Sequence, residues 1–150
     1  MTQFATLEDL GPIEDVVEIV RPGSKEPLKM KLLLVSTKEI EDIRKSHKWP
    51  RRKPSGSRLD PSTRQMMPYY DEEAYREEMN EAYTSFMYKI IVHTMMEPAI
   101  KGEDDDERVE NLQIALGGWA LPQLVKIVND RYGISPQEVE ATEENLQVPI

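Results

Sequence analysis

The chain lacks cysteine and has only two histidines, two tryptophans and two phenylalanines among its 150 residues. Without cysteine, disulfide bonds, thiolate nucleophiles and cysteine-ligated metal sites are excluded. No run approaches the roughly 18 consecutive apolar residues that a membrane-spanning helix requires. Residues 1–12 have neither the basic start nor the apolar region of a signal peptide. We therefore expect a soluble, intracellular protein that has no membrane partner.

Charge is distributed unevenly along this acidic chain. The formal net charge is −9, and the 39% hydrophobic and 31% charged residues predict one domain with a modest core. Residues 44–64 carry eight Lys or Arg against one acidic residue, whereas residues 1–43 carry five against nine and residues 65–150 six against eighteen. A basic island between acidic blocks bears on partners and solubility rather than on the fold.

The longest helical pattern runs from Asp71 to Pro98 and predicts a helix at the centre of the core. Its apolar residues recur at spacings of three and four: Ala74, Tyr75, Met79, Ala82, Tyr83, Phe86, Met87, Ile90, Ile91 and Met95. Asp71 suits the N-cap, and Pro98 prevents a regular helix beyond Glu97. From Phe86 onward nearly every side of the helix is apolar, so we expect other elements to surround that half.

Two segments near the N-terminus have the composition of strands. Residues 14–21 are rich in β-branched side chains, and residues 28–35 alternate apolar residues with lysines, so an antiparallel hairpin is predicted. An isolated hairpin is marginally stable, so this one should pack on helices. Ser36 and Glu39 have the spacing of a capping box, which predicts a helix from there to about His47.

Prolines and glycines interrupt the regular patterns in the later part of the chain. Residues 50–68 contain four prolines, three serines and a glycine, which favours a basic, exposed and mobile loop. One helix should end at Gly117, and another should follow from about Leu121 to Tyr132 and be capped by Gly133.

Together these patterns predict an α+β fold that is mainly helical, with an N-terminal antiparallel β-hairpin packed on a core of about four helices. A single domain should span residues 14–135. A flexible arm at residues 1–13 precedes it, and a short helix with a frayed acidic tail at residues 136–150 follows it.

The basic loop is the strongest local anomaly. Its cations could neutralise phosphates while Trp49 stacks on a base. The other interpretation is a solvated loop that pairs with the protein's own acidic blocks or with an acidic partner. We favour the second interpretation over nucleic-acid binding, because no nucleic-acid-binding motif accompanies the charge. The basic residues concerned are Arg51, Arg52, Lys53 and Arg58.

The few groups that could bind metal do not form a recognisable site. His93 and Glu97 stand four residues apart on the predicted helix, but two ligands do not make a site. The acidic run at residues 103–107 is consecutive, whereas calcium ligands occupy spaced positions. We predict no catalytic residue, metal or cofactor, and expect the protein not to be an enzyme.

Methionines cluster in and before the long helix, where flexible thioethers can fill a core or adapt to varied partners. Met66 and Met67 lie in a polar segment beside Tyr69 and Tyr70, and Trp119 lies at the joint between two predicted helices. Large apolar residues beside polar loops suit a binding surface, so these five residues are the predicted partner contacts.

The order of these elements resembles the tail assembly chaperones of long-tailed bacteriophages. Over roughly residues 14–135 the resemblance is carried by LKMKLLLVSTKEIEDIRK at residues 28–45, KIIVHTMMEPAI at residues 89–100 and LQIALGGWALPQLVKIVNDRYGIS at residues 112–135. The basic insertion at residues 50–68 departs from that pattern.

The resemblance implies a non-enzymatic chaperone, made in infected or lysogenic bacteria. Such a protein binds and solubilises the tape measure protein during tail morphogenesis and is displaced by tail tube assembly. Further copies of the chain and the tail tube protein are additional candidate partners. The alternatives are a structural virion component, such as a head–tail connector or tail-completion protein, and a nucleic-acid-binding regulator.

Overall fold

The computed structural model of the chain describes residues 3–6 and 13–133. The short helix and tail expected at residues 136–150, and most of the arm expected at residues 1–13, lie outside the described residues. The sequence predicts one domain over residues 14–135, and the described chain forms two compact units. We call them the three-stranded unit, up to His47 and from Ser85 to Gly133, and the two-stranded unit, Lys48–Thr84.

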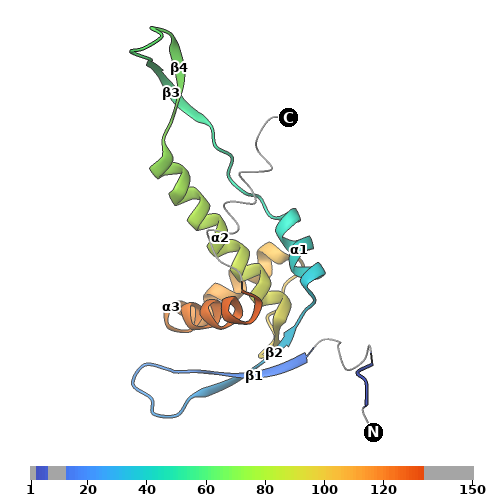
Figure 1. Ribbon diagram of the computed structural model, residues 1–150. Helices are drawn as coiled ribbons and strands as arrows, with labels where there is room; N and C mark the ends of the chain where they lie inside the picture. Colours follow the sequence, from blue (N-terminus) through green and yellow to red (C-terminus); the bar gives the residue numbers. More distant parts are fainter. Residues whose placement is uncertain (1–2, 7–12, 134–150) are drawn as a thin grey trace. The chain divides into compact units, whose positions relative to one another are not determined.

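The N-terminal hairpin forms as predicted. Strands β1 (Ile13–Ile19) and β2 (Leu28–Leu34) pair antiparallel in the three-stranded unit, with Val17 opposite Met30 (Figure 1). Both of these side chains are buried. Because alternate side chains of a strand face the same side, one face of the hairpin is apolar and packs inward.

A third strand was not predicted. The sequence pattern extends the long helix to Glu97, but α2 (Glu72–Thr94) ends earlier and the chain continues as β5 (Met95–Glu97). β5 pairs antiparallel with β2, so that Met95 lies opposite Leu32. Two physical causes override the helical pattern: pairing satisfies the otherwise open edge of β2, and the residue before Pro98 avoids the α region.

The described residues contain three helices besides the strands, and the third is kinked, so the predicted α+β class is confirmed while the predicted count of about four helices differs slightly. The Oγ atom of Ser36 accepts the amide of Glu39 at 3.3 Å and caps α1 (Thr37–Ser46), as expected. α3 (Asp105–Tyr132) contains both helices predicted on either side of Gly117. They meet at a kink at Gly117, whose φ of 61° and ψ of −174° are non-helical.

The core of the three-stranded unit surrounds the second half of α2, as expected. Phe86, Ile90 and Ile91 are almost wholly buried, together with Leu124 from α3 and Leu32 from β2. Burying a side chain of this size contributes about 1.5–3 kcal/mol. This cluster of aliphatic and aromatic groups is therefore the main source of stability in the unit.

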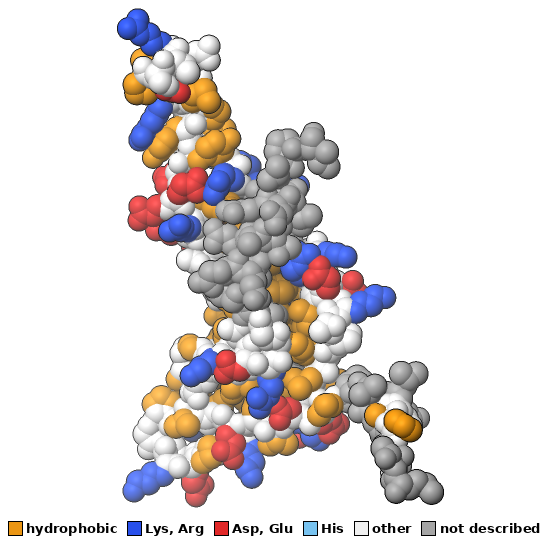
Figure 2. Space-filling model, viewed as in Figure 1, with side chains coloured by type: hydrophobic (Ala, Val, Ile, Leu, Met, Phe, Trp, Pro, Cys, Tyr) orange, Lys and Arg blue, Asp and Glu red, His pale blue; other side chains and the backbone are white. Residues whose placement is uncertain are grey.

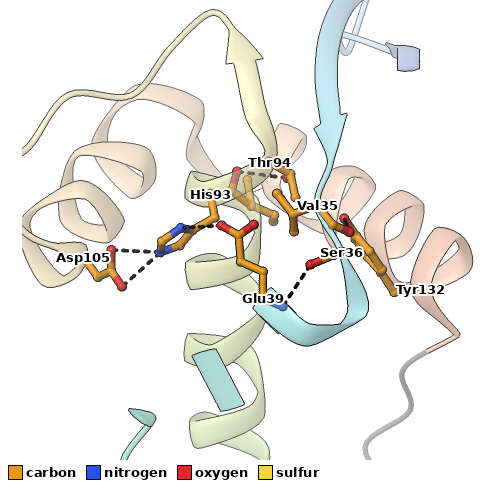
Figure 3. Close-up of polar contacts among 8 residues, drawn as sticks. Val35, Ser36, Glu39, His93, Thr94, Asp105 and Tyr132 are labelled. Carbon is orange, nitrogen blue, oxygen red and sulfur yellow. Dashed lines mark hydrogen bonds and ion pairs between the residues drawn. The ribbon is translucent and has the colours of Figure 1, made fainter. Parts of the chain in front are cut away.

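Polar contacts fasten α3 to the β1–β2 hairpin and the segment after it. The Gln123 amide accepts from the Val20 N–H at 2.8 Å and donates to the Val20 carbonyl at 2.9 Å. Arg131 Nε donates to Asp15 at 2.6 Å. The hydroxyl of Tyr132 donates to the Val35 carbonyl at 3.2 Å (Figure 3). These contacts fix the last turns of α3 against the strands.

The segment predicted as a loop at residues 50–68 instead contributes to a second antiparallel hairpin. β3 (Pro54–Leu59) pairs with β4 (Met66–Tyr70), with Leu59 opposite Met66. The prolines obscure the strand pattern in the sequence, because proline has no backbone N–H to donate to a neighbouring strand. Both strands of a two-stranded sheet are edge strands, where a missing N–H is tolerated. The expectation of a loop was therefore wrong for residues 54–59 and 66–68, although the segment is largely exposed, as expected.

The turn between β3 and β4 is organised by Asp60. Its Oδ1 accepts the Ser62 hydroxyl at 2.8 Å and the Ser62 amide at 2.9 Å, and these hydrogen bonds lower the pKa of Asp60. After the hairpin, Asp71 caps α2 as predicted, since its Oδ1 accepts the Ala74 amide at 3.1 Å. Local polar residues thus define both ends of the second hairpin.

Candidate partner-binding surface

The two-stranded unit exposes large apolar side chains on both of its strands. We define the β3–β4 surface as Leu59, Met66, Met67, Tyr69 and Tyr70. Met66 is 61% exposed and Leu59 60%, Met67 and Tyr70 are also exposed, and Tyr69 is half-buried. Figure 2 shows hydrophobic side chains over this hairpin with Lys and Arg among them. Four of the five predicted contact residues therefore lie together here.

The register divides the β3–β4 surface between two faces. Leu59 and Met66 are cross-strand partners, and so are Arg58 and Met67. Because side chains alternate along a strand, Leu59 and Met66 share one face, and Arg58 and Met67 share the other. Each face of the hairpin therefore offers apolar groups to a partner.

Two of the four predicted basic residues contact the protein's own side chains. The guanidinium carbon of Arg58 lies 3.8 Å from the centroid of the Tyr69 ring, which is cation–π geometry. Arg52 Nη2 lies 2.7 Å from Glu72 Oε2, and its guanidinium carbon lies 5.2 Å from the Tyr75 ring centroid. The pairing of Arg52 agrees with a basic segment that pairs with the protein's own acidic residues.

The other two basic residues, Arg51 and Lys53, line a cavity of about 510 Å³ in the same unit. Its wall includes Trp49 and Tyr75, and no pattern in the sequence predicts that these two residues share a site. The only feature of the sequence that points to this cavity is the run of basic residues around Trp49. The cavity itself depends on how residues 49–54 fold against the first turns of α2, and that is a tertiary feature.

Trp119, the fifth predicted contact residue, belongs to the three-stranded unit. It lies on α3 two residues after the break at Gly117, and it is half-buried. Its carbonyl accepts the Gln123 side-chain amide at 2.8 Å. The structure does not bring Trp119 into the unit that carries the β3–β4 surface.

A polar cluster in the three-stranded unit is centred on His93. Its Nε2 atom lies 3.0 and 3.1 Å from the two carboxylate oxygens of Asp105, and its Nδ1 atom lies 3.8 Å from Glu39 Oε1 (Figure 3). The two neighbouring hydroxyls are engaged, because Ser36 caps α1 and Thr94 donates to the Ile91 carbonyl. We assign the cluster to fastening α1, α2 and α3 together.

The metal-binding patterns weighed in the sequence do not assemble. Glu97 lies on β5, so the four-residue helical spacing from His93 is lost. In the acidic run, Asp104 caps α3 by accepting the Glu107 amide at 2.8 Å. Among residues 3–6 and 13–133, no group of three His, Cys, Asp or Glu side chains is placed to hold a metal ion.

Comparison of the chain with protein-family models, curated proteins and solved structures found no match. In the described part of the chain, no helix has both the length and the apolar character needed to cross a membrane. The function proposed below therefore depends on the side chains of this protein and on the resemblance in its sequence.

Proposed function

We propose that this protein is a phage tail assembly chaperone. It binds the tape measure protein in the cytoplasm of the bacterial host, keeps it soluble during tail morphogenesis and is displaced as the tail tube assembles. The tail tube protein and further copies of the chain are its additional partners. In this proposal the protein acts by binding alone and is not an enzyme.

The observation that carries the proposal is the exposed β3–β4 surface. Both faces of the β3–β4 hairpin expose apolar side chains, and exposed apolar groups gathered at a protein surface are characteristic of sites that bind other proteins. Met66 and Met67 are flexible and polarisable, so they can adapt to many apolar partners, as a chaperone must. Both are exposed, and Leu59 adds a third apolar group across the strand from Met66.

Charge provides a second line of support. The net charge of −9 gives the chain a strong excess of acidic residues. A partner protein with several bound copies of this chain carries a large negative charge. Such complexes repel one another, which opposes their aggregation. An acidic protein with an exposed apolar surface thus has the two properties required to hold an aggregation-prone partner in solution.

The test is co-expression with a tape measure fragment from the same genome, followed by size-exclusion chromatography with light scattering. We expect a soluble complex, whereas the fragment alone precipitates, and the measured mass gives the number of chains per fragment. Separate elution of the chain and continued precipitation of the fragment would refute the proposal. Mass spectrometry of purified particles is the complementary test, because a chaperone leaves the particle and a structural virion component stays.

A further inference from the structure

The cavity in the two-stranded unit is chemically distinct from the β3–β4 surface. Its volume of about 510 Å³ falls in the range of binding pockets for small ligands and peptide side chains. The residues that line it combine apolar and charged groups: Trp49, Pro50, Arg51, Lys53, Pro54, Asp71, Ala74, Tyr75 and Glu78. Trp49 is half-buried and Tyr75 is buried, so the aromatic part of the wall is held in place by the protein.

The charges around this cavity are not equally available. Arg52, which separates the two cationic lining residues in the sequence, is held by Glu72 at 2.7 Å. Asp71 accepts the Ala74 amide at 3.1 Å, so that carboxylate is engaged in capping α2. Arg51 and Lys53 are exposed, and neither forms an ion pair with any residue in the described ranges. Two cations beside an aromatic wall are therefore available to a ligand.

We propose that this cavity binds an acidic, apolar peptide segment of a partner protein, in which a large apolar side chain lies next to carboxylates. The apolar side chain packs against Trp49 and Tyr75, and the carboxylates pair with Arg51 and Lys53. The proposal deepens the proposed function, and it rests on that function in taking a segment of the tape measure protein as the natural ligand.

Charge complementarity favours a peptide over a nucleic acid. A nucleic-acid strand presents a phosphate at every nucleotide, and Glu78 in the cavity wall would repel some of them. In a peptide, by contrast, carboxylates can be confined to the positions that face Arg51 and Lys53, and neutral groups can lie near Glu78 and Asp71.

The test uses the full chain carrying Trp119→Phe, so that Trp49 is the only tryptophan. The probe is a short synthetic peptide with Leu and Phe between Glu residues, labelled with a neutral fluorophore. Two control peptides carry Lys in place of Glu, or Ser in place of Leu and Phe. Anisotropy of the probe gives the affinity. Tryptophan emission with the unlabelled peptide reports whether Trp49 is covered.

We expect the acidic apolar peptide to bind and to shift the Trp49 emission to shorter wavelength, and both control peptides to bind weakly. Arg51→Glu with Lys53→Glu should weaken binding by about tenfold or more, because each removes a charge-assisted contact. Arg64→Glu is the matched control, since Arg64 is an exposed cation of the same unit outside the cavity wall. It should leave the affinity within about twofold. Thermal melts confirm that the variants fold.

Equal binding by the wild type and the Arg51→Glu, Lys53→Glu variant, or no shift in Trp49 emission, would overturn the proposal. A single-stranded oligothymidylate that binds in the same assay while the peptide does not would assign the cavity to nucleic acid and also overturn it. The assay contains no phage partner. Its failure is therefore separate from a failure of co-expression, which would leave the cavity chemistry intact and remove only the natural ligand.

Discussion

His93 Nε2 lies 3.0 Å from Asp105 Oδ1, and this contact joins the last turn of α2 to the first turn of α3. The imidazole also faces Glu39 on α1, at 3.8 Å. The side chain of His93 is 25% exposed, so solvent screens this contact only in part. One side chain thus connects three helices of the three-stranded unit.

Removing this connection should cost stability. We expect His93→Ala and Asp105→Asn each to lower the free energy of unfolding by about 1 kcal/mol, the typical net value of a partly exposed hydrogen bond. The double variant should lose less than the sum of the two, since both changes remove the same contact. Urea denaturation measures all three values, and additive losses would show that the two side chains are not coupled.

Tyr132 gives the fold a dependence on alkaline pH. Burial raises the pKa of Tyr132, and the negative charge of Glu39 raises it further. The folded state therefore favours the neutral phenol, and its contribution is fully present below the ordinary tyrosine pKa of about 10. That contribution is lost as the pH rises through the raised value. Stability measured by urea denaturation should fall as the pH rises above about 10.

The tyrosine variants separate the sources of this alkaline loss. Burial also raises the pKa of Tyr83. Tyr132→Phe should reduce the loss, and the Tyr83→Phe, Tyr132→Phe double variant should reduce it further. At neutral pH, Tyr132→Phe should cost about 1 kcal/mol through the missing hydrogen bond. An unchanged alkaline profile in the double variant would exclude tyrosine ionisation as its cause.

Gly117 and Gly118 are adjacent but should respond in opposite ways to alanine. Gly117 has φ 61° and ψ −174°, a region that is open almost only to glycine, so Gly117→Ala should destabilise the fold by about 1–3 kcal/mol. Gly118 is helical and an added Cβ would contact nothing, so Gly118→Ala should stabilise it by about 0.5–1 kcal/mol. Thermal unfolding of the Gly117→Ala and Gly118→Ala variants measures both changes in stability. A loss of stability in both variants would contradict the account of the break in α3.

Local sequence features predicted the parts of the fold that depend on neighbouring residues. Ser36 and Asp71 cap helices as expected, because a cap involves residues only a few positions apart. The β1–β2 hairpin was predictable from alternation and a turn-rich connection. In contrast, β5 forms because a distant strand, β2, offers an open edge, and no pattern within residues 95–97 carries that information.

The candidate sites were predictable only in part, for the same reason. Composition pointed to Met66 and Met67 as exposed apolar groups, and both are exposed. The register that places Leu59 opposite Met66 was hidden by the prolines around it. The aromatic cavity requires Trp49 and Tyr75, which are far apart in the sequence and meet only when the unit folds.

The most direct test of the proposed function compares two variants in the co-expression experiment with a tape measure fragment. Met66→Asp places a charge on the β3–β4 surface, and Ile114→Asp places one at a 75% exposed apolar position on α3. We predict that Met66→Asp leaves the fragment insoluble, whereas Ile114→Asp yields the same soluble complex as the wild type. If Met66→Asp solubilises the fragment as well as the wild type does, the β3–β4 surface is not the site at which the partner binds.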